Sequence, residues 1–204
     1  MHKIFDNLLP QALQDRIENM VMSKDFSWFA LDNLSLGDQE EKYKFIYKDN
    51  YRYIETNGMS SLIYKDDLWY DPYGLYMMTR QIIDYIAEET GIETRRILRA
   101  KANFLTKNVD HSFDNMSINF PHLDNYNEHY VLVYYINDSD GDTILFNERF
   151  ENEHRLKNEP IELTTEARVK PKKGRILLFD GLQYHTSQNP INSSHRAILN
   201  INIV

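Results

Sequence analysis

The segment "PHLDNYNEHYVLVYYIND" at residues 121–138 places a histidine and an aspartate two positions apart, directly before an apolar, tyrosine-rich run. Side chains two apart on a strand point to the same side, so His122 and Asp124 can converge on one ion. Buried imidazoles and carboxylates are costly unless something pairs with them. The pair is therefore either a polar turn that leads into a core strand or part of a metal site that needs a further ligand.

A third candidate ligand and a cation follow downstream. The segment "GRILLFDGLQYHTSQNP" carries His185 after a turn, and Arg196 stands at the head of the terminal run "HRAILNINIV". Two histidines and a carboxylate form a facial triad that leaves coordination positions open, as in non-haem Fe(II) enzymes. Arg196 by itself is most simply a solvated arginine. If its face of the strand points inward, the guanidinium needs an anion, and its fork suits a carboxylate.

Composition narrows the class of protein. The 204 residues are 42% hydrophobic and 13% aromatic, which is typical of a globular domain with a sizeable core. The absence of cysteine excludes disulfides, thiolate-bound metals and a cysteine nucleophile, and we expect a cytoplasmic protein. The net charge of −8 weighs against a nucleic-acid partner. No apolar run approaches the roughly 20 residues needed to span a bilayer, so we expect no membrane partner.

Two segments of the first half have helical periodicity. Residues 10–23 place apolar side chains at helical spacing behind Pro10, which suits a first helical position. Residues 75–91 show the same period and end at Gly91, a favourable C-cap. Between them lie the short aromatic segments "KYKFIYK", "YRYIE" and "LIYKDDLWYDPYG". We expect residues 1–95 to form a helical and aromatic support region.

From residue 96 onward the pattern is that of successive strands separated by turns. In the last run, positions 197, 199, 201 and 203 are apolar, whereas the other face carries Arg196, Asn200 and Asn202 beside Ile198. Strands at short intervals without helices between them predict an antiparallel sandwich or barrel. We therefore expect a single domain, residues 1–204, that is mainly β, with N-terminal helices packed against a core at 96–204. The runs predicted as strands are "ILRAKANFLTK", "HYVLVYYIN", "DTILFNE", "PIELTTEARVK", "GRILLFDG" and "HRAILNINIV".

The order and spacing of these parts resemble the Fe(II)- and 2-oxoglutarate-dependent dioxygenases, in particular their prolyl 4-hydroxylase-like branch. The resemblance covers roughly residues 96–204 and rests on "HLDN", "LVYYIN", "DGDTILFNE", "VKPKKGRILLFDG", His185 and Arg196. It implies a double-stranded β-helix, the jelly-roll or cupin-like core, with a metal near one open end. It also implies Fe(II) and O2 as cofactors, 2-oxoglutarate as cosubstrate and ascorbate as a stimulant.

The resemblance also implies roles for individual residues. His122, Asp124 and His185 look like the metal ligands and hence the catalytic residues. Arg196 looks like the partner of the C5 carboxylate of 2-oxoglutarate. Tyr135 stands where relatives use a phenol to bind that same carboxylate.

Further cosubstrate contacts are implied at two positions with looser alignment. Asn103 falls near a polar or tyrosine position on the preceding strand, and Thr143 faces the pocket by analogy. If another cation holds the carboxylate, Arg99 and Lys101 are the next candidates. Ile198 departs from relatives that have a small hydroxyl side chain there, and the loop before the first histidine is long.

The reaction implied by the resemblance is hydroxylation of a C–H bond, with succinate and CO2 as co-products. Asp124 fills the position that halogenating relatives leave for a halide, which disfavours halogenation. Two histidines and a carboxylate also suit zinc-dependent hydrolysis, but that chemistry needs a general base and gives Arg196 no role. A non-catalytic jelly-roll binding module is the third alternative.

The resemblance favours a prolyl residue of a peptide or protein as substrate, and a free amino acid or other small molecule is the alternative. Trp69, Tyr70 and Tyr73 in the aromatic segment 64–76 suit a proline ring at the rim of the pocket, and the charged loop 147–159 is a second candidate for that rim. The simpler interpretations are core packing for the first and a solvated hairpin for the second. The remaining histidines, His129 among them, are interpreted as surface or loop residues, and the oligomeric state stays open.

Overall fold

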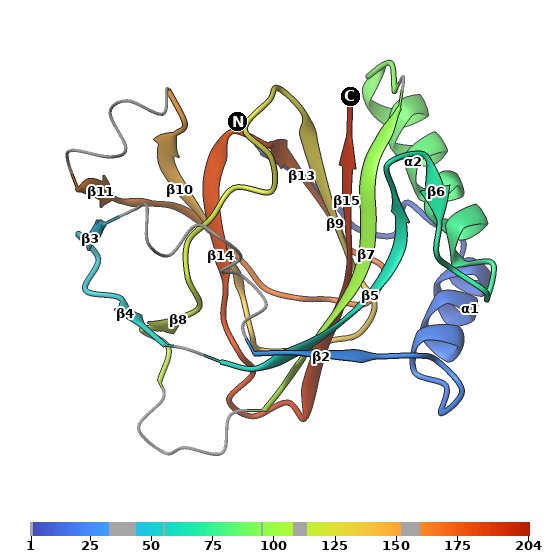
Figure 1. The fold of residues 1–204 in the computed structure, drawn as a ribbon, viewed down its shortest axis with the longest axis horizontal. Helices are drawn as coiled ribbons and strands as arrows, with labels where there is room; N and C mark the ends of the chain where they lie inside the picture. The colour runs from blue at the N-terminus through green and yellow to red at the C-terminus, as the bar shows by residue number, and fades with distance from the viewer. Residues whose placement is uncertain (1, 33–43, 55, 95, 108–113, 152–159) are drawn as a thin grey trace.

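Two sheets face each other in the computed structural model, and two helices cover the outer side of the larger sheet (Figure 1). The structure describes residues 2–32, 44–54, 56–94, 96–107, 114–151 and 160–204. The helices are α1 (Gln11–Val21) and α2 (Leu75–Thr90). The strands are β1 (Lys3–Phe5), β2 (Phe29–Leu31), β3 (Phe45–Tyr47), β4 (Arg52–Tyr53), β5 (Gly58–Lys65), β6 (Leu68–Trp69), β7 (Ile97–Thr106), β8 (Ser117–Ile118), β9 (Tyr130–Tyr135), β10 (Thr143–Arg149), β11 (Ile161–Leu163), β12 (Thr165–Val169), β13 (Ile176–Asp180), β14 (Gln183–Ser187) and β15 (His195–Ile203).

The larger sheet has the order β1-β13-β9-β15-β7-β5-β2, with β6 paired to β5, and the pairs along it are antiparallel. The smaller sheet has the order β12-β10-β14 and is also antiparallel. Two short parallel pairs, β11 with β3 and β4 with β8, lie beside it. This arrangement confirms the predicted mainly β fold with a jelly-roll core.

The hydrophobic core is divided by the larger sheet because side chains alternate between its two faces. Outward-facing residues of β9, β13 and β15 pack on α1 and α2, and they include Leu132, Leu178, Leu199 and Ile201. Inward-facing residues of the same strands pack against the smaller sheet. The apolar face predicted for the last run thus lies under the helices, and its polar face lies between the sheets.

Both predicted helices are confirmed. Gly91 ends α2 in the left-handed region at φ 71°, where glycine has no steric penalty, and its backbone N–H donates to Ala87 at 2.9 Å. Contrary to our expectation, Pro10 is not the first helical residue. It is the N-cap, with an extended ψ of 139°, and the helix begins at Gln11.

The predicted strands are confirmed with one difference. The run at 160–170 forms two strands, β11 and β12, because the chain changes partners at Thr164. There the Thr164 carbonyl accepts from the Asn147 backbone N–H at 2.9 Å, and the Thr164 N–H donates to Glu148 at 2.9 Å.

The N-terminal segments contribute more than support. Strands β1, β2 and β5 extend the larger sheet at its two edges, and β3 and β4 pair with strands of the second half. The predicted support region therefore contains sheet strands as well as helices. Within the described part of the chain, no helix combines the length and the apolar character that crossing a bilayer requires.

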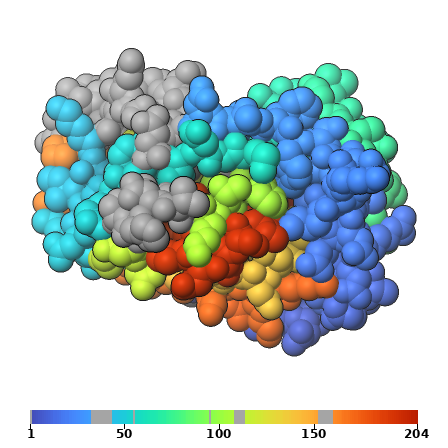
Figure 2. Space-filling model, turned by 90° about the horizontal axis from the view of Figure 1, so that it is seen from below, coloured from blue at the N-terminus to red at the C-terminus, as the bar shows by residue number. Residues whose placement is uncertain are grey.

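The start of β15 is fixed by two neighbouring segments. Figure 2 shows this face of the molecule, where the chain near β15 (red) lies beside the end of β7 (light green) and the β9–β10 loop (gold). The Asp140 carboxylate accepts backbone N–H groups of Ile191, Asn192 and Ser193 at 2.7–3.2 Å. The Lys107 N–H donates to the Ser194 carbonyl at 2.8 Å. These contacts determine where the first inward-facing side chain of β15 enters the interior.

We predict that Ile201→Ala destabilises the fold by about 2–5 kcal/mol, because the side chain is completely buried between β15 and the helices. The urea unfolding midpoint measures the change. Met77→Ala on α2 is the control, since that side chain is 59% exposed and its loss should change stability by less than about 0.5 kcal/mol. Equal midpoints for the two variants would contradict this description of the core.

Candidate metal centre and adjoining pocket

His122, Asp124 and His185 come together at one end of the space between the sheets. One potential ligand atom from each residue lies within 4.8 Å of the others. His185 belongs to β14, and His122 joins it through an isolated antiparallel bridge with backbone hydrogen bonds of 3.0 and 3.2 Å. The structure therefore places the three predicted ligands in one cluster, although His185 lies far from the other two in the sequence.

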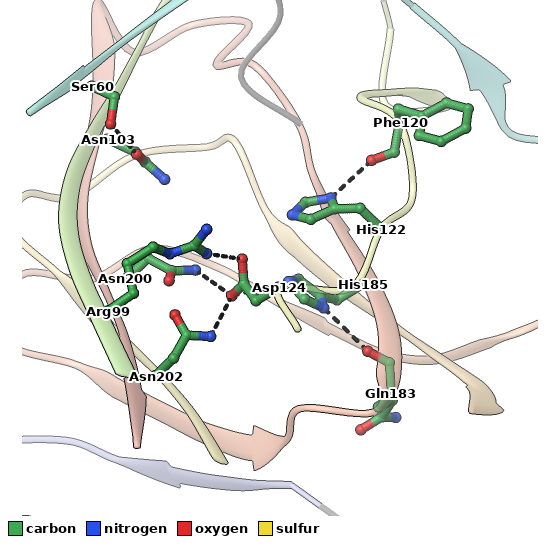
Figure 3. A network of polar contacts seen from close by, with 10 residues as sticks. All are labelled: Ser60, Arg99, Asn103, Phe120, His122, Asp124, Gln183, His185, Asn200 and Asn202. Carbon is green, nitrogen blue, oxygen red and sulfur yellow. Dashed lines mark hydrogen bonds and ion pairs between the residues drawn. The ribbon is translucent and has the colours of Figure 1, made fainter. Parts of the chain in front are cut away.

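Backbone carbonyl groups fix the orientation of both imidazoles (Figure 3). Nδ1 of His122 is 3.0 Å from the Phe120 carbonyl oxygen, and Nδ1 of His185 is 3.1 Å from that of Gln183. Since a carbonyl oxygen accepts, each Nδ1 carries the proton and each Nε2 keeps its lone pair. Nε2 of His185 is buried without a hydrogen-bond partner among the described residues. This is the orientation that metal-binding histidines adopt.

The Asp124 carboxylate is held by three side chains from the larger sheet, as Figure 3 shows. Oδ1 accepts from Nη2 of Arg99 at 2.5 Å. Oδ2 accepts from the side-chain amides of Asn200 at 2.9 Å and Asn202 at 3.0 Å. Nε2 of His185 is 3.9 Å from the same oxygen. The carboxylate is thereby fixed in place while its side chain is 2% exposed.

Sequence reasoning missed this support of Asp124. The polar alternation of the last run identified Asn200 and Asn202 as members of one face, but it did not indicate what that face would meet. Arg99 was considered only as a substitute for Arg196. A short sequence pattern holds no information on which strand lies opposite a given carboxylate.

The surroundings set the protonation states of the triad. Burial lowers the pKa of His122 to about 3, and the neighbouring His185 adds to that effect. Burial also lowers the pKa of His185. Burial alone would raise the pKa of Asp124, but Arg99 and then the two histidines hold it well below its usual range. At neutral pH the cluster therefore presents two neutral imidazoles and one carboxylate, so no proton would have to leave these groups before a metal ion binds.

Arg196 lies inside the protein at the start of β15 and is 2% exposed. Its Nη2 donates to Oγ1 of Thr143 at 2.7 Å, and the hydroxyl of Tyr135 donates to the same oxygen at 2.7 Å. The guanidinium carbon is 5.8 Å from the centre of the Tyr135 ring. Nε of Arg196 has no partner among the described residues. The face that carries Arg196 is therefore interior, and the solvated interpretation of this residue is wrong.

One pocket joins these groups. It is bordered by Arg196, Thr143 and Asn103 together with both histidines of the triad. Asn103 on β7 accepts from Oγ of Ser60 at 3.1 Å. Tyr135 is connected to the pocket through its hydrogen bond to Thr143. Lys101, predicted only as an alternative partner of the cosubstrate carboxylate, and Asn200, which was not predicted to line the pocket, also border it.

The described residues that border this pocket include none of the aromatic segment at 64–76, although Lys65 and Asp66 border a second cavity beside Asp124. Trp69 stacks on Tyr76 of α2 with ring centres 4.0 Å apart. The hydroxyl of Tyr73 donates to the Asp25 carbonyl at 2.9 Å, and its ring packs on Phe26. Trp69 and Tyr73 therefore pack against neighbouring aromatic rings, and Trp69 is still 61% exposed. Residues 152–159 of the charged loop lie outside the described residues.

His129 lies in the loop before β9, one of the two expected positions, but it is buried and not on the surface. It is 6% exposed, and its Nδ1 is 2.7 Å from the Asn127 carbonyl oxygen. A Cβ at Gly181 would lie 2.1 Å from the His129 ring, so the ring packs directly on the turn before β14. His129 thus supports the turn that leads to His185.

Comparison with known proteins identifies the fold. No protein-family model matches the sequence, and no curated protein matches it. A 2OG-Fe(II) oxygenase-family oxidoreductase from Burkholderia pseudomallei matches with a TM-score of 0.63 at 11% identity, covering 99% of this chain and 84% of its own. A prolyl hydroxylase from Trichoplax adhaerens, solved with a peptide fragment of hypoxia inducible factor, matches with a TM-score of 0.55 at 14% identity, covering 99% and 83%.

A third solved structure has a different activity. The non-heme α-ketoglutarate-dependent epimerase SnoN from nogalamycin biosynthesis matches with a TM-score of 0.63 at 9% identity, covering all of this chain and 78% of its own. Identities this low establish the fold and leave the reaction to be argued from the site. The chain therefore has the double-stranded β-helix fold that 2OG-Fe(II) oxygenases use.

Proposed function

We propose that this protein is an Fe(II)- and 2-oxoglutarate-dependent dioxygenase that hydroxylates a C–H bond of its substrate, with succinate and CO2 as co-products. One observation carries the proposal. The pocket that holds His122 and His185 also holds Arg196, a buried guanidinium without a carboxylate partner among the described residues. A metal site and a carboxylate site thus share one cavity.

The metal would be held by His122, Asp124 and His185. Nε2 of His185 is a buried nitrogen without a partner among the described residues, and the protonation states of the triad suit a divalent cation. Two imidazoles and one carboxylate are the donor set of non-haem Fe(II) oxygenases. Iron bound there, with 2-oxoglutarate and O2, would supply the oxidising power. The contribution of the protein is to orient the three ligands and to exclude water around them.

Arg196 would bind the C5 carboxylate of 2-oxoglutarate. Burying a guanidinium is unfavourable unless it meets an anion, and the nearby Asp142 is already paired with Arg168 at 3.2 Å. Thr143 accepts from both Arg196 and Tyr135, so it holds the guanidinium and the phenol at the same end of the pocket. Asn103 borders the same pocket and would contact the cosubstrate from β7.

Zinc-dependent hydrolysis finds less support. That reaction needs a general base beside the metal, and no carboxylate is among the described residues that border the pocket of the two histidines. Zinc-dependent hydrolysis would also provide no anionic ligand for the buried guanidinium of Arg196.

The substrate class is less constrained by the fold. One solved relative in fold was crystallised with a peptide and is a prolyl hydroxylase, whereas another is an epimerase from nogalamycin biosynthesis. Trp69, which suited a proline ring, stacks on Tyr76 of α2. A prolyl peptide therefore remains one candidate substrate, supported by the likeness in fold.

The direct test is succinate release from 2-oxoglutarate with Fe(II) and O2. We expect slow uncoupled succinate formation without substrate, and none when Fe(II) is withheld or replaced by Zn(II). Proline-containing peptides are tested as stimulants, with mass spectrometry for the gain of one oxygen atom. A protein that binds iron and still yields no succinate with or without peptides would contradict the proposal.

We predict that Asp124→Ala and His185→Ala abolish measurable Fe(II) binding, because each removes one of three ligands. Anaerobic calorimetry measures the affinity, and far-UV circular dichroism checks that the sheets persist. His2→Ala is the matched control, since His2 pairs with Glu166 outside the pocket at 2.8 Å. Wild-type iron affinity in Asp124→Ala would rule out this ligand set.

We predict that Arg196→Leu raises the KM for 2-oxoglutarate by at least about 30-fold, since the loss of a buried charged partner is worth on the order of 2–5 kcal/mol. Tyr135→Phe removes one neutral hydrogen bond and should raise the KM by roughly 2–10-fold. Arg16 is exposed on α1 and does not border the pocket, so Arg16→Leu is the control and should leave the KM unchanged. An unchanged KM in Arg196→Leu would show that another cation holds the cosubstrate.

A further inference from the structure

Strand β7 places two cations beside the triad. Arg99 and Lys101 are two residues apart, so both side chains point to the inner face of the sheet. Their partners on β15 are Asn202 and Asn200, respectively. Arg196 precedes Asn202 by six residues on β15, which is roughly 20 Å along a strand. Arg99 and Arg196 therefore stand at opposite ends of one polar row, and Lys101 lies between them.

Neither of these two β7 cations is fully neutralised. Arg99 donates one hydrogen bond to Asp124, but its Nε is buried without a partner among the described residues. The ammonium group of Lys101 forms no hydrogen bond or ion pair with any residue in the described part of the chain. Burial and then the neighbouring Arg99 lower the pKa of Lys101 to about 8. An anion placed between the two side chains would offset both the cost of burying the Lys101 ammonium group and its repulsion by Arg99.

A cavity opens on this side of the triad. Its volume is about 270 Å³, and Arg99 is part of its wall. Lys101, the next inward-facing residue of β7, and Arg196 border the pocket of the two histidines instead. The cavity wall carries three cations and two carboxylates, and one of the carboxylates is the proposed metal ligand. Lys65 and Asp66 at the mouth of the cavity are exposed, and Nζ of Lys65 is 3.9 Å from Oδ2 of Asp66. The residues that matter here are Lys65, Asp66, Arg96, Arg99, Asp124 and Asn202.

Once the proposed ligands are bound, the two ends of the polar row on β7 and β15 differ in net charge. The far end holds Arg196, and the near end, beside the metal, holds Arg99 and Lys101. At the far end the C5 carboxylate of 2-oxoglutarate would neutralise Arg196. At the near end the charge of Asp124 would be shared with the metal, which leaves Arg99 and Lys101 without an anion of their own. Arg96 adds a further positive charge to the cavity wall. The near end is thus the part of the site with surplus positive charge.

We propose that the substrate carries a carboxylate, and that Arg99 and Lys101 bind this group next to the metal while Arg96 and Lys65 attract it at the mouth of the cavity. The inference rests on the proposed function, because it assigns Arg196 to 2-oxoglutarate. The guanidinium fork and the ammonium point charge together suit a carboxylate. The wall carboxylates Asp66 and Asp124 favour a singly charged group over a doubly charged phosphate.

Binding of matched probes tests the inference without turnover. Protein loaded with Mn(II) and 2-oxoglutarate is titrated by calorimetry under nitrogen. One series pairs N-acetyl amino acids with their amides, which tests a main-chain carboxylate. A second series pairs doubly capped peptides that contain Asp or Glu with their Asn or Gln counterparts, which tests a side-chain carboxylate. We expect at least tenfold tighter binding of the carboxylate member in one of the two series.

Variants assign this preference to the named residues. Lys101→Gln should reduce the preference at least fivefold, and Lys101→Arg should largely restore it. The matched control is Lys170→Gln, which removes the same charge from an exposed position and should leave the preference unchanged. Arg99→Gln should also reduce the preference, and its Mn(II) affinity is measured in parallel because Arg99 holds Asp124.

The outcomes distinguish the inference from the proposed function. Protein that binds Mn(II) and 2-oxoglutarate but prefers no carboxylate over its amide contradicts the inference and leaves the proposed function intact. The inference is equally contradicted if phosphoserine peptides bind more tightly than every carboxylate probe, or if Lys101→Gln weakens 2-oxoglutarate binding instead of probe binding. Protein that binds neither Mn(II) nor 2-oxoglutarate contradicts the proposed function and the inference together.

Discussion

The alternation of side chains along β15 is the constraint on which both the core and the site depend. Its outward face, with Leu199 and Ile201, is buried under α1 and α2, and its inward face carries Arg196, Asn200 and Asn202. A slip of one residue would place the polar face under the helices and the apolar face in the pocket. The burial that stabilises the fold therefore also fixes the side chains that hold Asp124 and line the pocket, which makes the site a rigid part of the sheet.

Electrostatics explains why so many polar groups are tolerated between the sheets. Asp124 is buried and charged because Arg99 and two asparagine amides satisfy its oxygens. The histidines are buried and neutral because their Nδ1 atoms meet backbone carbonyls. Arg196 and Lys101 lack comparable partners among the described residues, and both border the pocket. Groups satisfied by the protein thus hold the site together, and groups left unsatisfied indicate what the site binds.

Local patterns in the sequence predicted the helices, most strands and the pair His122 and Asp124, because each depends on periodicity or on short spacing. Gly91, for example, is found where helical periodicity stops, and the chain ends α2 there. His185 lies far along the chain, and its role as the third ligand was implied by the resemblance to a family. Contacts between distant segments were not predictable in the same way. Nothing in the pattern shows that Arg99 meets Asp124, or that Thr164 is where one strand becomes two. The sequence left two interpretations of Trp69 open because an exposed aromatic run looks the same whether it faces a ligand or stacks on a helix, as Trp69 does on Tyr76.

The central claim is that one pocket brings 2-oxoglutarate onto a metal held by His122, Asp124 and His185. Anaerobic titration of the Fe(II)-loaded protein with 2-oxoglutarate, followed by visible absorption, tests it most directly. Chelation of iron by the 2-oxo acid gives a metal-to-ligand charge-transfer band. We predict that this band appears and saturates at one equivalent of 2-oxoglutarate per iron. Saturable binding of 2-oxoglutarate without the band, or no binding at all, would contradict the claim.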